Sequence, residues 1–188
     1  MYRIAGSLLA ALLFFSGTAL ADKYDDTADL FRNAGASNAF FGNSYGYAIF
    51  PTVGKAGFGV GGARGKGRVF VRGNHVANTT MTQLSVGFQI GGQGFSQIIF
   101  FEDERSFREF STGNFEFGAN ASAVAITASA QASASTSGPS AGASGGKKDA
   151  TTAGTSYYKG MKVFTITKGG LMYEASIGGQ KFSYRPNS

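Results

Sequence analysis

The sequence predicts an α+β fold in a single domain, with short N-terminal helices packed on a strongly curved, mostly antiparallel sheet of roughly seven to nine strands. Residues 22–44 show no strand alternation, whereas most of the chain from residue 45 alternates with period two between Gly, Asn and Asp turn signals. Residues 103–110 interrupt that pattern and predict one further short helix. The many glycines permit tight coiling, so near-closure of the sheet into a barrel stays open.

The N-terminal segment 22–44 is expected to form one or two short helices. Its apolar residues stand among small and polar ones, without the alternation of a strand. Asp25, Asp26 and Asp29 fall in the first turns, where carboxylates interact favourably with the positive end of the helix dipole. These charges indicate that the first helix begins just before them.

The expected strands are 45–51, 68–71, 81–90, 95–102, 115–127, 161–167, 171–177 and 180–184. Pro51 is expected to end the first of them, since proline cannot donate to a sheet. The segment 95–102 is apolar on both faces and is therefore placed in the middle of the sheet. In 81–90, residues such as Leu84 alternate with residues such as Gln83, which predicts a sheet with one wetter side.

The stretch "GKAGFGVGGARGKGRVF" at 54–70 contains the pattern G-x-G-x-x-G at 57–62. A dinucleotide site needs a helix after these glycines, but a charged segment and then a β run follow. A phosphate-binding P-loop is excluded as well, because Val60 and Gly67 stand where that motif needs Gly and Ser or Thr. We therefore expect no nucleotide here.

The same stretch also has the period-two alternation of a strand, and one face of that strand, which we call the bare face, has almost no side chains. Small residues occupy that face: Gly57, Gly59, Gly61, Ala63, Gly65 and Gly67. The other face carries Arg64, Lys66 and Arg68 near the strand end, so we expect the strand to run into a basic turn that contacts lipid head groups. A second row of small residues is formed by Ala119, Ala121, Ala123 and Ala125. Two such rows could make a trough for an acyl chain or could receive the protein's own side chains, and both alternatives remain open.

Residues 1–21 have the anatomy of a secretory signal peptide. Arg3 precedes an apolar run at 8–15, and a small-x-small cleavage pattern ends at Ala21. We expect one domain at 22–188, within which the Ala/Ser/Gly-rich segment 128–156 forms a mobile loop. The chain has no cysteine, so an exported chain of this composition fits the bacterial periplasm, with membrane association or release from the cell as alternatives.

Catalytic machinery is not evident in the sequence. The single histidine, His75, lies in a loop-like context, and without cysteine no Cys/His cluster can bind a metal. The carboxylates at 102–104 fit a helix start better than an acid/base pair. Asp103 is the candidate cap, and the helix would bury Phe107 and Phe110. We expect a protein that is not an enzyme and that needs no cofactor or metal.

The blocks "YGYAIFPTVGKAGFGVGGARGKGRVF", "MTQLSVGFQIGGQGFSQIIFFED", "FEFGANASAVA" and "GLMYEASIGGQKFSY" together resemble the SYLF domain family. The resemblance covers roughly residues 45–127 and 157–184. It implies a lipid-binding module, since eukaryotic members bind phosphoinositides, some also bind actin filaments, and exported bacterial members are envelope proteins with lipid affinity. One difference is the acidic N-terminal segment "DKYDDTADLF", where eukaryotic members use a basic amphipathic helix.

The sequence therefore predicts a periplasmic protein that binds anionic phospholipid or a membrane surface, and neither nucleic acid nor a nucleotide. The net charge of +6 supports anionic partners. The expected head-group ligands are Lys55, Arg64, Lys66, Arg68 and Arg72. Phe58 and Val60 would lie at the acyl boundary. The alternatives are a structural, adhesion or biofilm protein that contacts a protein partner of unknown kind through 128–156, and a small outer-membrane β-barrel, which the charges within the strands disfavour.

Overall fold

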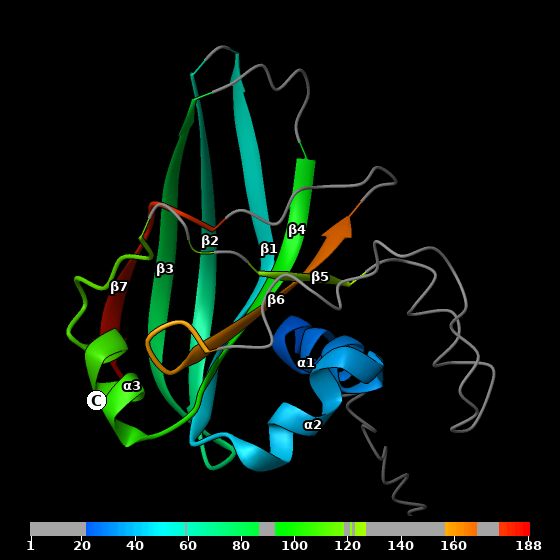
Figure 1. The fold of residues 1–188 in the computed structure, drawn as a ribbon, viewed down its shortest axis with the longest axis vertical. Helices are drawn as coiled ribbons and strands as arrows, with labels where there is room; N and C mark the ends of the chain where they lie inside the picture. Colours follow the sequence, from blue (N-terminus) through cyan, green and yellow to red (C-terminus); the bar gives the residue numbers. More distant parts are fainter. Residues whose placement is uncertain are drawn as a thin grey trace, which may run out of the picture.

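The computed structural model describes residues 22–58, 60–86, 93–118, 121, 123–126, 157–168 and 177–188. The expected signal peptide at 1–21 and the expected loop at 128–156 lie outside these ranges. In Figure 1, the three helices lie toward one end of a twisted sheet, and β1, β2 and β3 extend beyond them toward the other end. The long strands thus form a tip that no described helix covers.

The three helices are α1 (Lys23–Asn33), α2 (Gly35–Asn43) and α3 (Glu104–Ser111), as the sequence predicts. Asp22 caps α1 by accepting a hydrogen bond from the backbone N–H of Tyr24. Asp103 caps α3 in a capping box, in which Ser106 N–H donates to Asp103 Oδ1 at 2.8 Å and the backbone N–H of Asp103 donates to Ser106 Oγ at 3.2 Å. The helices α1 and α3 therefore begin where a short acidic side chain satisfies free backbone donors, whereas α2 follows Ala34 and has no side-chain cap.

Seven strands form one sheet: β1 (Gly46–Phe58), β2 (Val60–Val71), β3 (Asn74–Val86), β4 (Gln93–Phe101), β5 (Val124–Ile126), β6 (Met161–Lys168) and β7 (Gln180–Pro186). Their order is β5-β6-β4-β1-β2-β3-β7. All neighbouring pairs are antiparallel except β5 and β6. The sheet is open, with β5 and β7 at its edges, which confirms the α+β class and the inner position expected for 95–102.

Three expected strand boundaries are wrong. β1 continues through Pro51 because its register against both neighbouring strands shifts just there, between Ile49 and Val53, which accommodates the proline. The glycine stretch is a hairpin in which Phe58 pairs with Val60, so its basic residues lie within β2 and not in a turn. In the segment expected at 115–127, only β5 is a described strand.

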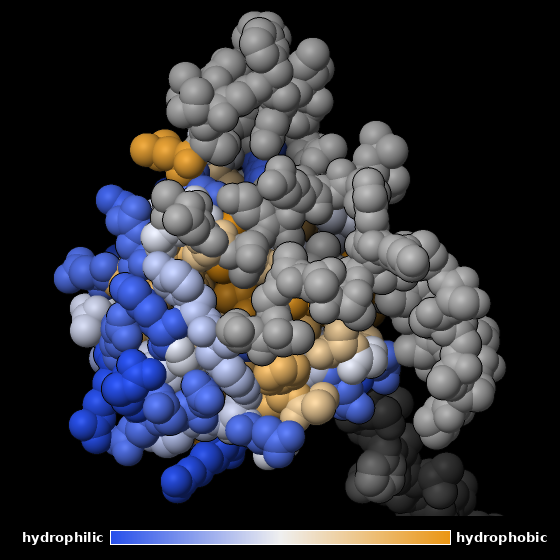
Figure 2. Space-filling model, in the orientation of Figure 1, coloured by the Kyte–Doolittle hydropathy of each residue, from blue (hydrophilic) through white to orange (hydrophobic). Residues whose placement is uncertain are grey.

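The two faces of the sheet carry separate cores. On the helical face, α1 packs Tyr24, Ala28 and Phe31 against apolar residues of β1, β4, β5 and β6. On the opposite face, which we call the inner face, α3 and the chain after it pack Phe110, Phe115 and Phe117 over Phe50, Val53, Phe95, Phe101 and Phe182. Figure 2 shows hydrophilic residues gathered over α3 and β7, with hydrophobic ones toward the middle of the molecule. Because α1 and α2 cover only part of the helical face, no helix among the described residues covers the surface of β2, β3 and β7 on that side.

The bare face of β2 is filled by the protein itself. A Cβ at Gly67 would come within 2.6 Å of the Phe50 ring, and one at Gly65 within 2.7 Å of Val53 Cγ2. Ala121 and Ala123 are buried in the same core, whereas Ala119 and the side chain of Ala125 lie outside the described part. At Gly65 and Gly67, then, the small side chains make room for phenylalanine and valine of β1.

Candidate functional site

The uncovered part of the helical face carries a regular array of basic and hydroxyl side chains. The register places Arg64 of β2 opposite Thr82 of β3, which in turn lies opposite Lys181 of β7. The next row is formed by Lys66, Thr80 and Ser183, and the third by Arg68, Asn78 and Arg185. We call the surface of Arg64, Lys66, Thr80, Thr82, Lys181, Ser183 and Arg185 the basic face. Since side chains alternate along each strand, these residues share one side of the sheet.

Two shallow depressions lie on the basic face, and Arg64 lines both. The first has a volume of about 340 Å³ and is also lined by Lys23, Thr52 and Lys66. The second has a volume of about 370 Å³ and is also lined by Thr80, Thr82, Lys181, Ser183 and Arg185. Each depression thus combines several cations with hydroxyl groups, the combination that binds phosphate oxygens.

The cations of the basic face differ in whether a carboxylate pairs with them. Lys181 pairs with Glu116 at 3.3 Å, whereas within the described ranges no ion pair joins Arg64, Lys66 or Arg185 to a carboxylate. All four side chains are exposed. The face therefore carries a net positive charge that an anionic ligand could neutralise.

Arg68 borders the basic face but is already engaged. Its guanidinium pairs with Asp22 and lies 4.1 Å from the centre of the Tyr24 ring. The backbone N–H of Tyr24 and the Arg68 side chain both stabilise the Asp22 carboxylate, so the pKa of Asp22 lies below its ordinary value. Arg68 thus joins β2 to the start of α1.

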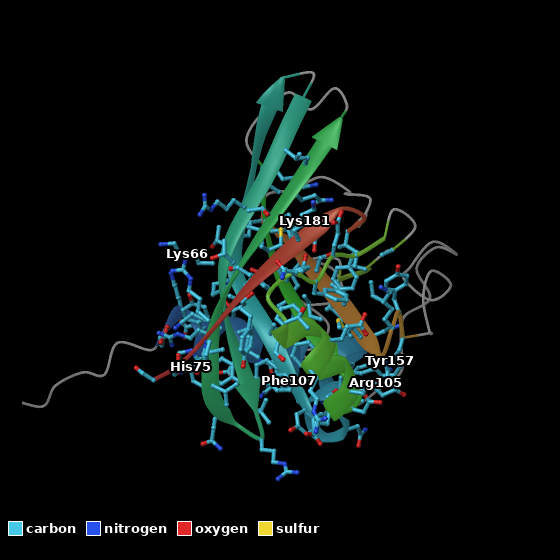
Figure 3. The ribbon with its side chains drawn as sticks, turned by 90° about the vertical axis from the view of Figure 1, so that its left-hand side faces the viewer. Lys66, His75, Arg105, Phe107, Tyr157 and Lys181 are labelled. Atoms are coloured by element: carbon cyan, nitrogen blue, oxygen red, sulfur yellow. The ribbon has the colours of Figure 1, made fainter. Side chains whose placement is uncertain are left out.

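The structure separates the remaining two expected head-group ligands from this face. Arg72 lies in the turn between β2 and β3, at the opposite end of β2, 5.9 Å from the Tyr45 ring centre. Lys55 pairs with Ala63 and lies on the inner face, where it is only 7% exposed. Of the five expected residues, Arg64 and Lys66 are therefore the two that stand together and exposed, as Figure 3 illustrates for Lys66, on the side of the sheet away from α3.

Lys55 has an unusual environment for a lysine. Its ammonium lies 5.5 Å from the centre of the Phe95 ring, and burial lowers its pKa to about 8. Lys55 lies opposite Ala63, and the same row of paired residues continues across β3 and β7 to Gln83 and Gln180. These two glutamines belong to a buried amide cluster. Gln97 and Gln180 bond each other reciprocally at 2.8 and 3.1 Å, and Gln83 donates to the carbonyl of Gly178.

Leu84 was missed as a site residue and is the most exposed large apolar side chain among those described, at 84%. The expectation that the side of β3 with Gln83 is the wetter one is wrong. Gln83 is buried in the amide cluster, and Leu84 faces solvent. Leu84 pairs with Gly62, one strand repeat beyond the pair of Arg64 and Thr82. It therefore lies about 7 Å along the strand from the basic face, toward the tip.

The two expected acyl-boundary residues stand at that same tip. Phe58 ends β1, Val60 begins β2, and the two are paired in the register. Their side chains lie outside the described part of the structure. The backbone alone therefore places both residues beyond Leu84, at the uncovered end of the long strands.

Lys181 and Arg185 were also missed, although the sequence carried their signal. In "QKFSYRP", Lys181, Ser183 and Arg185 alternate with Phe182 and Tyr184. This pattern gives one basic, hydroxylated face and one aromatic face, which the structure shows. What the pattern could not show is that β7 lies two strands from β2 on the same side as Arg64.

Two other kinds of site are absent from the part of the chain that the structure describes. No helix in the described ranges is long and apolar enough to cross a bilayer. Likewise, among the residues that the structure places, no group of His, Asp and Glu side chains could hold a metal ion. The basic face and the adjoining tip thus remain the strongest candidate site.

The described chain is thus an open, twisted α+β sheet with a basic face that no described helix covers. The family described as "Ysc84: Las17-binding protein actin regulator" matches residues 82–188. The chain belongs to this family, whose domain is the SYLF domain that its sequence blocks resemble. Membership supports roles of the lipid-binding or actin-regulator type.

One relative adds to this assignment. The chain is 28% identical over 155 residues to the protein named "Beta cell expansion factor A" from Aeromonas veronii. The match covers 81% of this chain and 51% of that protein. The chain thus spans about half the length of this curated relative.

Proposed function

We propose that the chain is a non-enzymatic protein that binds the surface of anionic phospholipid bilayers in the bacterial periplasm. The observation that carries the proposal is the position of exposed Leu84 one strand repeat from Arg64, so that an apolar tip adjoins a basic face. Peripheral membrane proteins combine these two features, since apolar residues enter the acyl boundary while cations meet the phosphates. Arg64, Lys66, Lys181 and Arg185 are the cations in this arrangement.

The expected energies favour reversible binding. A Lys or Arg close to an anionic leaflet contributes about 1 kcal/mol, which salt screens. Burying a leucine side chain contributes about 2 kcal/mol. Phe58 and Val60, which stand beyond Leu84 along the strands, would add to the apolar contribution. The charges of the basic face and the apolar residues of the tip are therefore expected to contribute comparable amounts to binding.

Vesicle flotation at low and high salt tests the proposal. The double variant Arg64→Gln/Lys66→Gln removes two cations and is expected to weaken binding about 30-fold at low salt, which corresponds to about 2 kcal/mol. Arg108→Gln is the control, because Arg108 is also exposed but lies on α3, across the sheet. It should bind as the wild type does.

Two results would contradict the proposal. One is the absence of flotation with vesicles that contain phosphatidylglycerol. The other is wild-type binding by the double variant. Deletion of 128–156 distinguishes the alternative of a structural or adhesion protein: vesicle binding should survive the deletion, whereas binding through this segment would be lost.

The periplasmic part of the proposal rests on the sequence of residues 1–21, with its apolar run and its cleavage pattern. Expression of the full chain in a Gram-negative host should give a periplasmic protein that begins at Asp22. N-terminal sequencing of the purified protein checks this. An unprocessed protein in the cytoplasmic fraction would contradict it.

A further inference from the structure

Arg64 occupies a special position on the basic face because it lines both depressions. We propose that the basic face binds one lipid head group that carries two phosphates, with Arg64 between them. This inference rests on the proposed function and adds the class of lipid. It is carried by the separate cations of the two depressions and by the residue that they share.

Each depression has its own cations and hydroxyl groups that can bind one phosphate. The first offers Lys23 and Lys66 beside Thr52, whose hydroxyl already accepts a hydrogen bond from Lys168 Nζ at 2.8 Å. The second offers Lys181 and Arg185 beside the hydroxyls of Thr82 and Ser183. Ammonium, guanidinium and hydroxyl groups are all donors to phosphate oxygens.

The spacing favours two phosphates over one. Arg64 on β2 and Lys181 on β7 lie in the same row with β3 between them, so their backbones are about 10 Å apart. A phosphate oxygen accepts hydrogen bonds at about 3 Å, so a phosphate seated in one depression leaves the cations of the other uncovered. Two phosphates joined in one head group neutralise both sets at once.

The chemistry of arginine suits the position between them. A planar guanidinium presents five donors in a rigid fork and can bond two acceptors on different sides, whereas lysine offers one compact charge. Arg64 is exposed, and among the described residues no ion pair engages it, so its fork is available. Its loss should therefore uncouple the two depressions and leave the local fold unchanged.

The test compares two vesicle populations in phosphatidylcholine, one with diphosphatidylglycerol and one with phosphatidylglycerol, at equal phosphate content. The full chain is expected to bind the first several-fold more tightly, although the surface charge is the same. Arg64→Gln should abolish this preference. Lys181→Gln/Arg185→Gln, which leaves Arg64 as the one cation among the described residues that line the second depression, should abolish it as well while retaining binding to phosphatidylglycerol. Arg108→Gln should keep the preference.

Equal affinity for the two populations would overturn the inference and leave the proposed function standing, since each depression would then bind a separate single-phosphate lipid. A preference that survives in Arg64→Gln would overturn it too. Failure to bind either population would overturn the proposed function itself.

Discussion

Gly67 of β2 lies directly against the ring of Phe50 in β1. A methyl group at Gly67 would meet Phe50 Cδ1 and Cε1 at 2.6 Å and the carbonyl oxygen of Ile49 at 2.8 Å. Phe50 is fully buried in the inner-face core, so its ring cannot move aside without disturbing that core. The bare face of the strand is thus a packing surface within the protein.

Gly67→Ala is accordingly expected to destabilise the protein by about 1–3 kcal/mol, the usual effect of an added methyl group in a packed core. Urea unfolding measures this. Gly54→Ala is the matched control, since Gly54 is also a strand glycine but is exposed and has open space at its Cβ position. The control should be unchanged or more stable by about 0.5 kcal/mol. Equal stabilities for the two variants would contradict the packing role.

Lys55 makes stability depend on pH. Burial lowers its pKa from 10.5 to about 8, so between these values the unfolded chain binds more protons than the folded one. Stability therefore rises as pH increases from about 8 to 10.5, by at most about 3 kcal/mol. Lys55→Met should be more stable than the wild type at pH 7 and should lose this rise.

Unfolding curves at several pH values check the prediction for Lys55, with exposed Lys66→Met as the control. The difference in stability between the wild type and Lys55→Met isolates the titration of Lys55 from that of other groups. A difference that stays constant from pH 7 to pH 10.5 would show that burial does not shift this lysine.

Gln97 and Gln180 should behave as a coupled pair. Each amide satisfies the other in a fully buried position, so Gln180→Leu leaves the Gln97 amide with unpaired groups. Each single leucine variant is expected to cost about 1–3 kcal/mol, whereas Gln97→Leu/Gln180→Leu should cost less than their sum. Additive costs in the double-mutant cycle would show that the two amides do not depend on each other.

The local elements were predictable because their signals are local. The acidic residues in the first turns of α1, the cap at Asp103 and the apolar run of β4 each fix their own element. The path of β1 through Pro51 was not predictable, since it depends on a register shift against two neighbouring strands. Local sequence also cannot show that Gln83 is buried, because its partners Gly178 and Gln180 lie about a hundred residues further along the chain.

The part of the candidate site that lies on one strand was predictable, and the part that distant strands contribute was not. Alternation along β2 correctly places Arg64 and Lys66 on one side of the strand. The expected set wrongly included Lys55, which lies opposite Ala63 on the inner face, and it lacked Lys181 and Arg185 of β7. Residues of distant strands share a site through the order of the sheet, which no single segment encodes.

The most direct test of membrane binding through the tip uses a fluorescent label at Leu84. The chain has no cysteine, so Leu84→Cys gives one attachment point for an environment-sensitive dye, and Ser111→Cys at the end of α3 gives the control. With vesicles that contain phosphatidylglycerol, the Leu84 label is expected to shift to the blue and to become inaccessible to an aqueous quencher, while the Ser111 label stays unchanged. A protein that floats with the vesicles while its Leu84 label stays in water would contradict the account.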